Sequence, residues 1–99
     1  MTAYVIAESP YLDTPEVRAY RELAQASIAR YGGRYLARGV LPEALEGDWA
    51  GDHRMVVIEF DSLERAKSWY GSPEYAAARA TRSDLGGRRM LFLPGASAH

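Results

Sequence analysis

The segment His53–Phe60 (HRMVVIEF) restricts the fold more than any other part of the sequence, because it is apolar at both alternating parities. Successive side chains of a strand point to opposite faces of a sheet. One parity carries valine, isoleucine and phenylalanine, and the other carries Met55 and Val57 between His53 and Glu59. A sheet with helices on one side normally alternates apolar and polar residues. The pattern therefore predicts a strand that is covered on both faces.

Three further segments are predicted as strands, and two of them share the double-sided apolar pattern. The first strand covers residues 3–8 (AYVIAE) and the last covers residues 88–94 (RRMLFLP). Residues 33–39 (GRYLARG) form the remaining strand, with a short continuation at 44–47 (ALEG). The glycine pair at 86–87 predicts a turn, and the last residues, GASAH, predict a frayed tail.

The first helix is predicted between Thr14 and Gly32. Thr14 is a favourable N-cap and Pro15 suits the first helical position, while Gly32 and Gly33 form a typical C-terminal stop. Apolar residues recur at helical spacing, which gives an inner stripe of Val17, Tyr20, Leu23, Ala24, Ile28 and Tyr31. The opposite side carries Arg18, Arg21, Glu22 and Gln25.

A second helix is predicted to begin after a cap at residue 61 or 62. Its inner stripe consists of Leu63, Ala66 and Tyr70. The helix breaks within SWYGSPEY, residues 68–75, because Pro73 has no N–H to donate to the carbonyl of Trp69. Ser72 can then cap a new helical piece. We predict that Trp69 turns toward a partner surface or a pocket wall, because an indole is seldom left in water.

These elements follow the order β-α-β-β-α-β within a single domain of residues 1–99. That order predicts an α+β protein of the ferredoxin-like type, with an antiparallel sheet and both helices on one face. The other face of the sheet carries more large apolar side chains than a monomer usually exposes. We therefore predict a homodimer whose two sheets pack face to face into a barrel. The alternative is a monomer that tolerates the apolar face.

The charge balance narrows the classes of partner. Twelve basic residues stand against thirteen acidic ones, so we predict no binding to nucleic acid or to a membrane surface. Eleven of the twelve basic residues are arginine, which suits phosphate or carboxylate recognition, although we favour a bias in composition. The sequence has no cysteine, no signal-peptide pattern and no apolar run of the ~20 residues that a membrane span needs. We therefore predict a cytoplasmic protein.

Four segments, GGRYLARG, LEGDW, RMVVIEF and WYGSPEY, occur in an order and spacing that resemble the domain-of-unknown-function 1330 family. The resemblance covers residues 3–93 and departs at RGVLPEAL, where relatives often carry a second glycine. It implies membership of the dimeric α/β-barrel superfamily of ferredoxin-like folds, in which two protomers join their sheets. It implies no established activity. Neighbouring families of the superfamily include cofactor-independent monooxygenases, lactone isomerases and haem enzymes, so the fold alone does not choose among these activities.

Familiar catalytic and cofactor motifs are missing, since the sequence contains no G-x-S-x-G, H-E-x-x-H, P-loop or G-x-G-x-x-G pattern. We predict no cofactor and no metal. The acidic loop EGDWAGDH suits a hard metal ion through Glu46, Asp48, Asp52 and His53, but its spacing matches no calcium loop and a solvated turn is the simpler interpretation. A haem would have only His53 as its proximal ligand, because His99 sits on the tail.

The candidate ligand-binding residues accompany the apolar strands and are Arg34, Tyr35, Arg38, His53, Glu59 and Trp69. Arg34 and Arg38 share one face of a predicted strand, and His53 and Glu59 share one face of another. If these faces converge, acidic and basic groups lie inside an apolar cavity, which is the usual composition of a small-molecule pocket. The pocket is placed between the sheet and the helices or at the seam of the barrel.

Three functions remain open on this evidence. The first is a homodimer that binds a small organic molecule. The second is a cofactor-independent isomerase or monooxygenase that uses Glu59 or His53 as its general base, because burial raises the pKa of a carboxyl group. An arginine that pairs with Glu59 would instead hold it ionised in a structural ion pair. The third is a structural dimer without a ligand.

Overall fold

The computed structural model describes residues 1–49, 51–82 and 88–96. Its elements are, in order, β1 (Ala3–Ser9), α1 (Pro15–Arg30), β2 (Arg34–Val40), β3 (Arg54–Phe60), α2 (Leu63–Tyr70), α3 (Pro73–Arg79) and β4 (Arg89–Pro94). The predicted α+β order is confirmed, except that residues 44–47 form no strand. The turn predicted at residues 86–87 and the end of the predicted tail, residues 97–99, lie outside the described residues.

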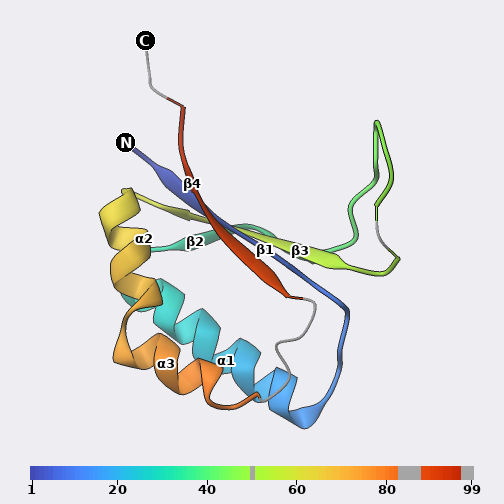
Figure 1. The fold of residues 1–99 in the computed structure, drawn as a ribbon. Coiled ribbons are helices and arrows are strands. Elements are labelled where there is room, and N and C mark those ends of the chain that lie inside the picture. Colours follow the sequence, from blue (N-terminus) through green and yellow to red (C-terminus); the bar gives the residue numbers. More distant parts are fainter. Residues whose placement is uncertain (50, 83–87, 97–99) are drawn as a thin grey trace.

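The sheet is antiparallel with strand order β2-β3-β1-β4, and the helices cover one of its faces (Figure 1). α1 and α3 lie side by side beneath the sheet, and α2 is the helix that approaches the strands most closely. On the covered face, Val5 of β1 is buried beside its register partner Ile58 of β3. No helix of the described residues is long and apolar enough to cross a membrane.

We call the opposite side of the sheet the bare face, because no described helix covers it (Figure 1). Its apolar side chains come from three strands and include Ile6, Met55, Val57, Leu91 and Leu93. Leu91 and Leu93 keep 56% and 51% of their surface exposed. The prediction that the strands are apolar on both faces is confirmed.

Trp69 lies at the centre of the core beneath the covered face. Its side chain is only 1% exposed, and its ring centroid lies 5.5 Å from that of Phe60 and 4.3 Å from that of Tyr75. The indole Nε1–H donates a hydrogen bond of 2.9 Å to Ser27 Oγ of α1. The apolar body of the indole is thus buried while its polar group is satisfied, as a buried tryptophan requires.

The chain breaks between α2 and α3 as predicted, and Ser72 caps α3 by accepting the Tyr75 N–H at 3.0 Å. The predicted inner position of Tyr70 is wrong. Trp69, three residues after the buried Ala66, takes the inner stripe instead, and Tyr70 at the end of the helix is partly exposed. Because α3 starts at a new angle, the indole points into the core rather than toward a partner chain.

The first helix follows its predicted signals closely. Thr14 caps α1, since its Oγ1 accepts the N–H of Val17 at 3.2 Å. The predicted inner stripe is correct for Val17 and wrong for Leu23, which is 42% exposed. The cap of α2 is Ser62, the second of the two residues predicted for that position.

The pairing of β2 with β3 is irregular, and this changes which face its side chains take. Tyr35 pairs with Ile58, but Ala37, two residues later, pairs with Val57, one residue earlier on the partner strand. This β-bulge reverses the alternation of side chains beyond it. A further register shift follows before Val40.

Gly33 marks the closest approach of the chain to the core. A Cβ at this position would lie 2.7 Å from the ring of Phe60 and 2.8 Å from Ile28. The backbone between α1 and β2 can run directly over the core only because glycine has no side chain.

We expect Gly33→Ala to lower the free energy of unfolding by about 1–3 kcal/mol, the usual cost of forcing volume into a packed core. Urea denaturation followed by tryptophan fluorescence measures the change. Gly71→Ala is the matched control, because its Cβ would meet only the Lys67 carbonyl oxygen at 3.6 Å, and we expect a change below ~0.5 kcal/mol. Equal losses in the two variants would contradict the contact argument.

Candidate functional site

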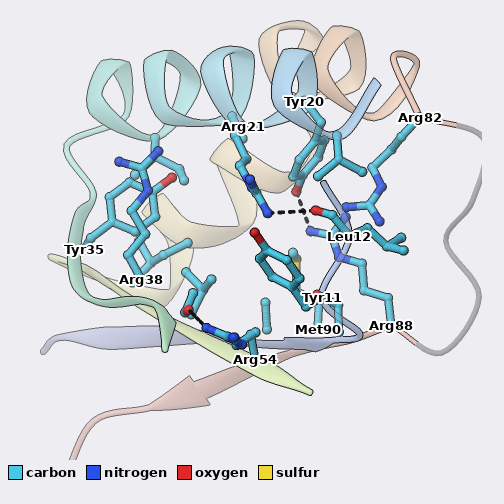
Figure 2. Close-up of a pocket in the computed structure, with 18 of the residues that line it drawn as sticks. Tyr11, Leu12, Tyr20, Arg21, Tyr35, Arg38, Arg54, Arg82, Arg88 and Met90 are labelled. Atoms are coloured by element: carbon cyan, nitrogen blue, oxygen red, sulfur yellow. Dashed lines mark hydrogen bonds between the residues drawn. The ribbon is translucent and has the colours of Figure 1, made fainter. Parts of the chain in front are cut away.

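A cavity of about 360 Å³ lies between α1 and the covered face of the sheet (Figure 2). One wall is the inner side of α1, the opposite wall is formed by β1, β2 and β3, and the loop of residues 10–12 borders it. Small-molecule sites typically measure about 300–1,000 Å³. The cavity is therefore large enough for a small organic molecule.

The inner surface of the cavity is largely apolar. Val56 and Ile58 line it from β3, Ala24 and Ile28 from α1, and Trp69 from α2. The role of Trp69 as a wall of a ligand pocket stays a prediction. Trp69 thus contacts the core on one side and the cavity on the other.

Five arginines line the same cavity, namely Arg21, Arg38, Arg54, Arg82 and Arg88. Figure 2 shows them spaced around the cavity rather than stacked at one end. None of the described lining residues is acidic. The cavity is consequently cationic, although the whole chain has a formal net charge of −1.

Arg38 and Tyr35 form one side of the cavity (Figure 2). The guanidinium carbon of Arg38 lies 4.5 Å from the ring centre of Tyr35, and an Nη atom donates to Gln25 Oε1 of α1 at 2.9 Å. The predicted shared face of Arg34 and Arg38 is wrong, because the bulge after Tyr35 turns Arg38 toward the helices. Burial raises the pKa of Tyr35 above its ordinary value.

Tyr11 lies near the middle of Figure 2, between two of the arginines. Its ring centre is 4.8 Å from the guanidinium carbon of Arg54 and 6.0 Å from that of Arg21. Arg21 also donates to the Leu12 carbonyl oxygen at 3.0 Å, which ties the loop to α1. Arg54 Nη1 makes a long contact of 3.4 Å to the Gly39 carbonyl oxygen.

Arg88 contacts a pair of tyrosines at another side of the cavity. The hydroxyls of Tyr20 and Tyr75 lie 2.7 Å apart, and Arg88 donates to both, with 3.2 Å to Tyr75. Burial, followed by the nearby Tyr20, raises the pKa of Tyr75 well above its ordinary value. The hydroxyl of Tyr75 therefore stays protonated at neutral pH and does not neutralise the guanidinium.

The sequence of this chain matches the model of a known protein family. The model, described as "Domain of unknown function (DUF1330)", matches residues 2–96. The chain belongs to the DUF1330 family. The match confirms the resemblance seen in the sequence. Among curated proteins, the DUF1330 chain has no match.

The DUF1330 chain is similar to solved structures of other proteins of unknown function. A protein from Rhodopseudomonas palustris is 18% identical with a TM-score of 0.65, covering 98% of this chain and 84% of that one. A dimeric ferredoxin-like protein from Bacteroides fragilis is 17% identical with a TM-score of 0.55, covering 95% of each chain. A dimeric ferredoxin-like protein from Thermobifida fusca is 16% identical with a TM-score of 0.52, covering 95% and 91%. These likenesses confirm the ferredoxin-like fold.

The remaining candidate residues of this DUF1330 domain lie on the bare face, away from the cavity. Glu59 accepts a hydrogen bond of 2.7 Å from Arg34 Nε, and Arg34 also lies 3.6 Å from a carboxylate oxygen of Asp61. The pKa of Arg34 is raised, foremost by its hydrogen bond to Glu59. Glu59 is therefore part of an ion pair, the arrangement that the sequence left open beside the general-base role.

His53 also lies outside the cavity, in a cluster with Glu8 and Arg89. Its Nδ1 is 2.9 Å from one carboxylate oxygen of Glu8, and Arg89 Nε donates to the other oxygen at 3.0 Å. The hydrogen bond from Arg89, and then that from His53, lowers the pKa of Glu8. In the described part of the chain, no three histidine or acidic side chains come together in a way that suits a metal ion.

Several cavity residues were not candidates from the sequence, although some signals for them exist. Arg54 shares the parity of Val56 and Ile58 in its strand, and Tyr20 belongs to the predicted inner stripe of α1. Arg21 was predicted on the outer side of the helix, yet its long side chain reaches the rim of the cavity. Arg88 and Met90 likewise share the parity of Phe92 in the last predicted strand, whereas no comparable local pattern identifies Tyr11.

The lowered pKa of Glu8 predicts a pH dependence of stability. Because the ionised form is favoured in the folded chain, its contribution is fully present above the ordinary pKa of 4.5 and is lost as the pH falls through the lower folded value. We expect Glu8→Gln to be less stable than wild type at neutral pH, with the difference shrinking in acid. Urea denaturation from about pH 3 to pH 7 measures it.

Glu22→Gln, at an exposed position on α1, controls for the loss of one negative charge. A difference between wild type and Glu8→Gln that stayed constant across the acidic range would contradict the ion-pair interpretation.

Proposed function

We propose that this DUF1330 protein binds a small organic molecule in the cavity between α1 and the sheet. The observation that carries the proposal is a volume of about 360 Å³ with an apolar interior and polar side chains at its border, which is how ligand sites are usually built. Of the six candidate residues, Tyr35, Arg38 and Trp69 line this volume and are the proposed ligand contacts.

The cavity is a better candidate than the polar groups of the bare face. Glu59 and His53 are engaged with Arg34 and Glu8 respectively, and neither lines the cavity. A general base must lie within hydrogen-bond reach of the proton that it removes. A reaction that uses Glu59 or His53 on a molecule in this cavity therefore has no support from the geometry, and binding is the function that we propose.

We also propose that two copies of the chain pack their bare faces together. Leu91 and Leu93 expose about half of their surfaces on this side, beside the apolar Ile6 and Val57, and burial of such surface contributes about 25 cal/mol per Å². The similar proteins from Bacteroides fragilis and Thermobifida fusca are described as dimeric. A cytoplasmic location and the absence of a nucleic-acid partner stay predictions from the sequence.

The binding proposal predicts stabilisation by a ligand. In a thermal-shift screen of small acidic and aromatic compounds, we expect at least one to raise the melting temperature, since a ligand at 100 times its Kd adds about 2.7 kcal/mol. Ala24→Phe should abolish the shift, because Ala24 lines the cavity and a phenyl ring there occupies it. Ala24→Leu serves as a milder second variant.

Ala19→Phe is the matched control, because residue 19 is exposed on the same helix and does not line the cavity. This variant should keep the full shift. A screen without any stabilising compound, or a shift that survives in both Ala24 variants, would show that the cavity is not a binding site.

The dimer proposal predicts a particular oligomeric state. We expect the wild type to have the mass of a dimer in light scattering at micromolar concentration, and Leu91→Glu to have the mass of a monomer, because it places a charge in the apolar contact. Leu23→Glu, an equal change at an exposed position on α1, should remain dimeric. A folded wild-type monomer at that concentration would overturn the proposal.

A further inference from the structure

Two groups of arginines in this protein differ in the partners that they contact. In the described part of the chain, those that pair with carboxylates are Arg18, Arg30, Arg34 and Arg89. Four of the cavity arginines instead contact hydroxyl, amide or carbonyl oxygens and tyrosine rings, and they are Arg21, Arg38, Arg54 and Arg88. These four guanidinium groups therefore lie around one cavity, next to neutral polar groups and aromatic rings.

No described residue that lines the cavity is acidic, so none of them offsets these guanidinium charges. A guanidinium group cannot lose its proton in a protein, so the charges persist at every physiological pH. An anion inside the cavity would be attracted by these charges more strongly than in bulk water, whereas a neutral molecule would not.

Arg54 shows where such an anion would be held. Its Nε is buried and has no hydrogen-bond partner among the described residues, while its Nη1 is directed to the Gly39 carbonyl oxygen. The edge formed by Nε and Nη2 is the fork that binds carboxylate or phosphate oxygens through two parallel hydrogen bonds. A buried donor without a partner is costly, and because Arg54 lines the cavity, a turn of its side chain toward the cavity would let an oxyanion satisfy this edge.

The other residues that line the cavity indicate the chemistry of the rest of the ligand. The ring of Tyr11 faces the guanidinium of Arg54 at 4.8 Å, and the apolar side chains of Val56 and Ile58 line the cavity from the same strand as Arg54. Trp69 adds an aromatic surface. These groups offer contacts for an apolar or aromatic body and few hydrogen bonds for a polar one.

We infer that the ligand of this cavity is an organic oxyanion, with a carboxylate or phosphate head group held by Arg54 and an apolar or aromatic body against Val56, Ile58 and Trp69. This inference rests on the proposed function and adds the chemical class of the ligand. It involves no reaction. The head group binds at the edge of Arg54 that includes the unpartnered Nε. The remaining cavity arginines add positive charge that attracts the anion.

Matched pairs of compounds test the inference directly. Isothermal titration calorimetry compares benzoate, phenylacetate and phenylpropanoate with their uncharged amides, and phenyl phosphate serves as the phosphate probe. We expect at least one anion to bind about tenfold or more tightly than its neutral counterpart, because hydrogen bonds to a charged group are stronger than those to a neutral one. The tighter head group identifies whether carboxylate or phosphate is preferred.

The variant Arg54→Gln tests whether Arg54 binds the head group of the ligand. This variant should bind the best anion about tenfold or more weakly while its melting temperature stays at or above that of the wild type, because the substitution removes an unsatisfied buried donor. Arg65→Gln is the matched control, since it removes the same charge from an exposed position on α2 outside the cavity. It should bind the anion as the wild type does.

The outcomes separate the two proposals. If an acid and its amide bind equally well and Ala24→Phe blocks both, the cavity is a binding site but the anion inference is overturned. If the anion binds more tightly but Arg54→Gln changes nothing, the role of Arg54 is overturned. If no compound of either kind binds, the proposed function and the inference fail together.

Discussion

The contact of Trp69 with Ser27 and Phe60 determines how far the helices stand from the sheet. α1 approaches α3 more closely than it approaches the strands, so side chains rather than backbone contacts set its height above the sheet. The indole fills the space at one end of this gap, held to α1 by its hydrogen bond to Ser27 and packed against the tilted ring of Phe60 of β3. The remaining space is the cavity. A bulky anchor at one place thus creates an opening beside it.

Charged side chains are arranged differently on the two faces of the sheet. On the bare face, Glu59 and Glu8 are each paired with arginine, so that polar groups among apolar neighbours are neutralised locally. On the covered face, the cavity gathers arginines and none of its described lining residues is acidic. The nearly neutral total of twelve basic and thirteen acidic residues conceals this separation. Net charge describes how a protein behaves in solution, but the position of each charge decides what it can bind.

Much of the fold could be predicted because its signals are local. The caps at Thr14 and Ser72, the break before Pro73 and the double-sided apolar strands each depend on residues that are neighbours in the chain. The position of Arg38 could not be predicted by counting alternate residues, because a bulge shifts the count by one. Gly39, with a φ of +62°, is the one local sign of irregularity in that strand.

The cavity was harder to predict than the fold. Its existence depends on the distance between α1 and the sheet, and its lining comes from residues far apart in the sequence, such as Tyr11, Arg54 and Arg88. Strand parity does place Arg54 on the covered side with Val56 and Ile58, so this residue was within reach of the sequence. The missing hydrogen-bond partner of the Arg54 Nε could not be predicted from the sequence, because it depends on every neighbour that surrounds this atom.

The bulges of β2 also affect how the borders of the sheet meet other chains. β2 and β4 are the two outer strands. An outer strand with regular spacing offers aligned N–H and C=O groups to any extended chain that arrives, and bulges or prolines interrupt that row. β2 is irregular along its length and β4 ends at Pro94. Growth of the sheet into a fibril by lateral addition of strands is therefore discouraged along β2, whereas in β4 only the final residue lacks an N–H group.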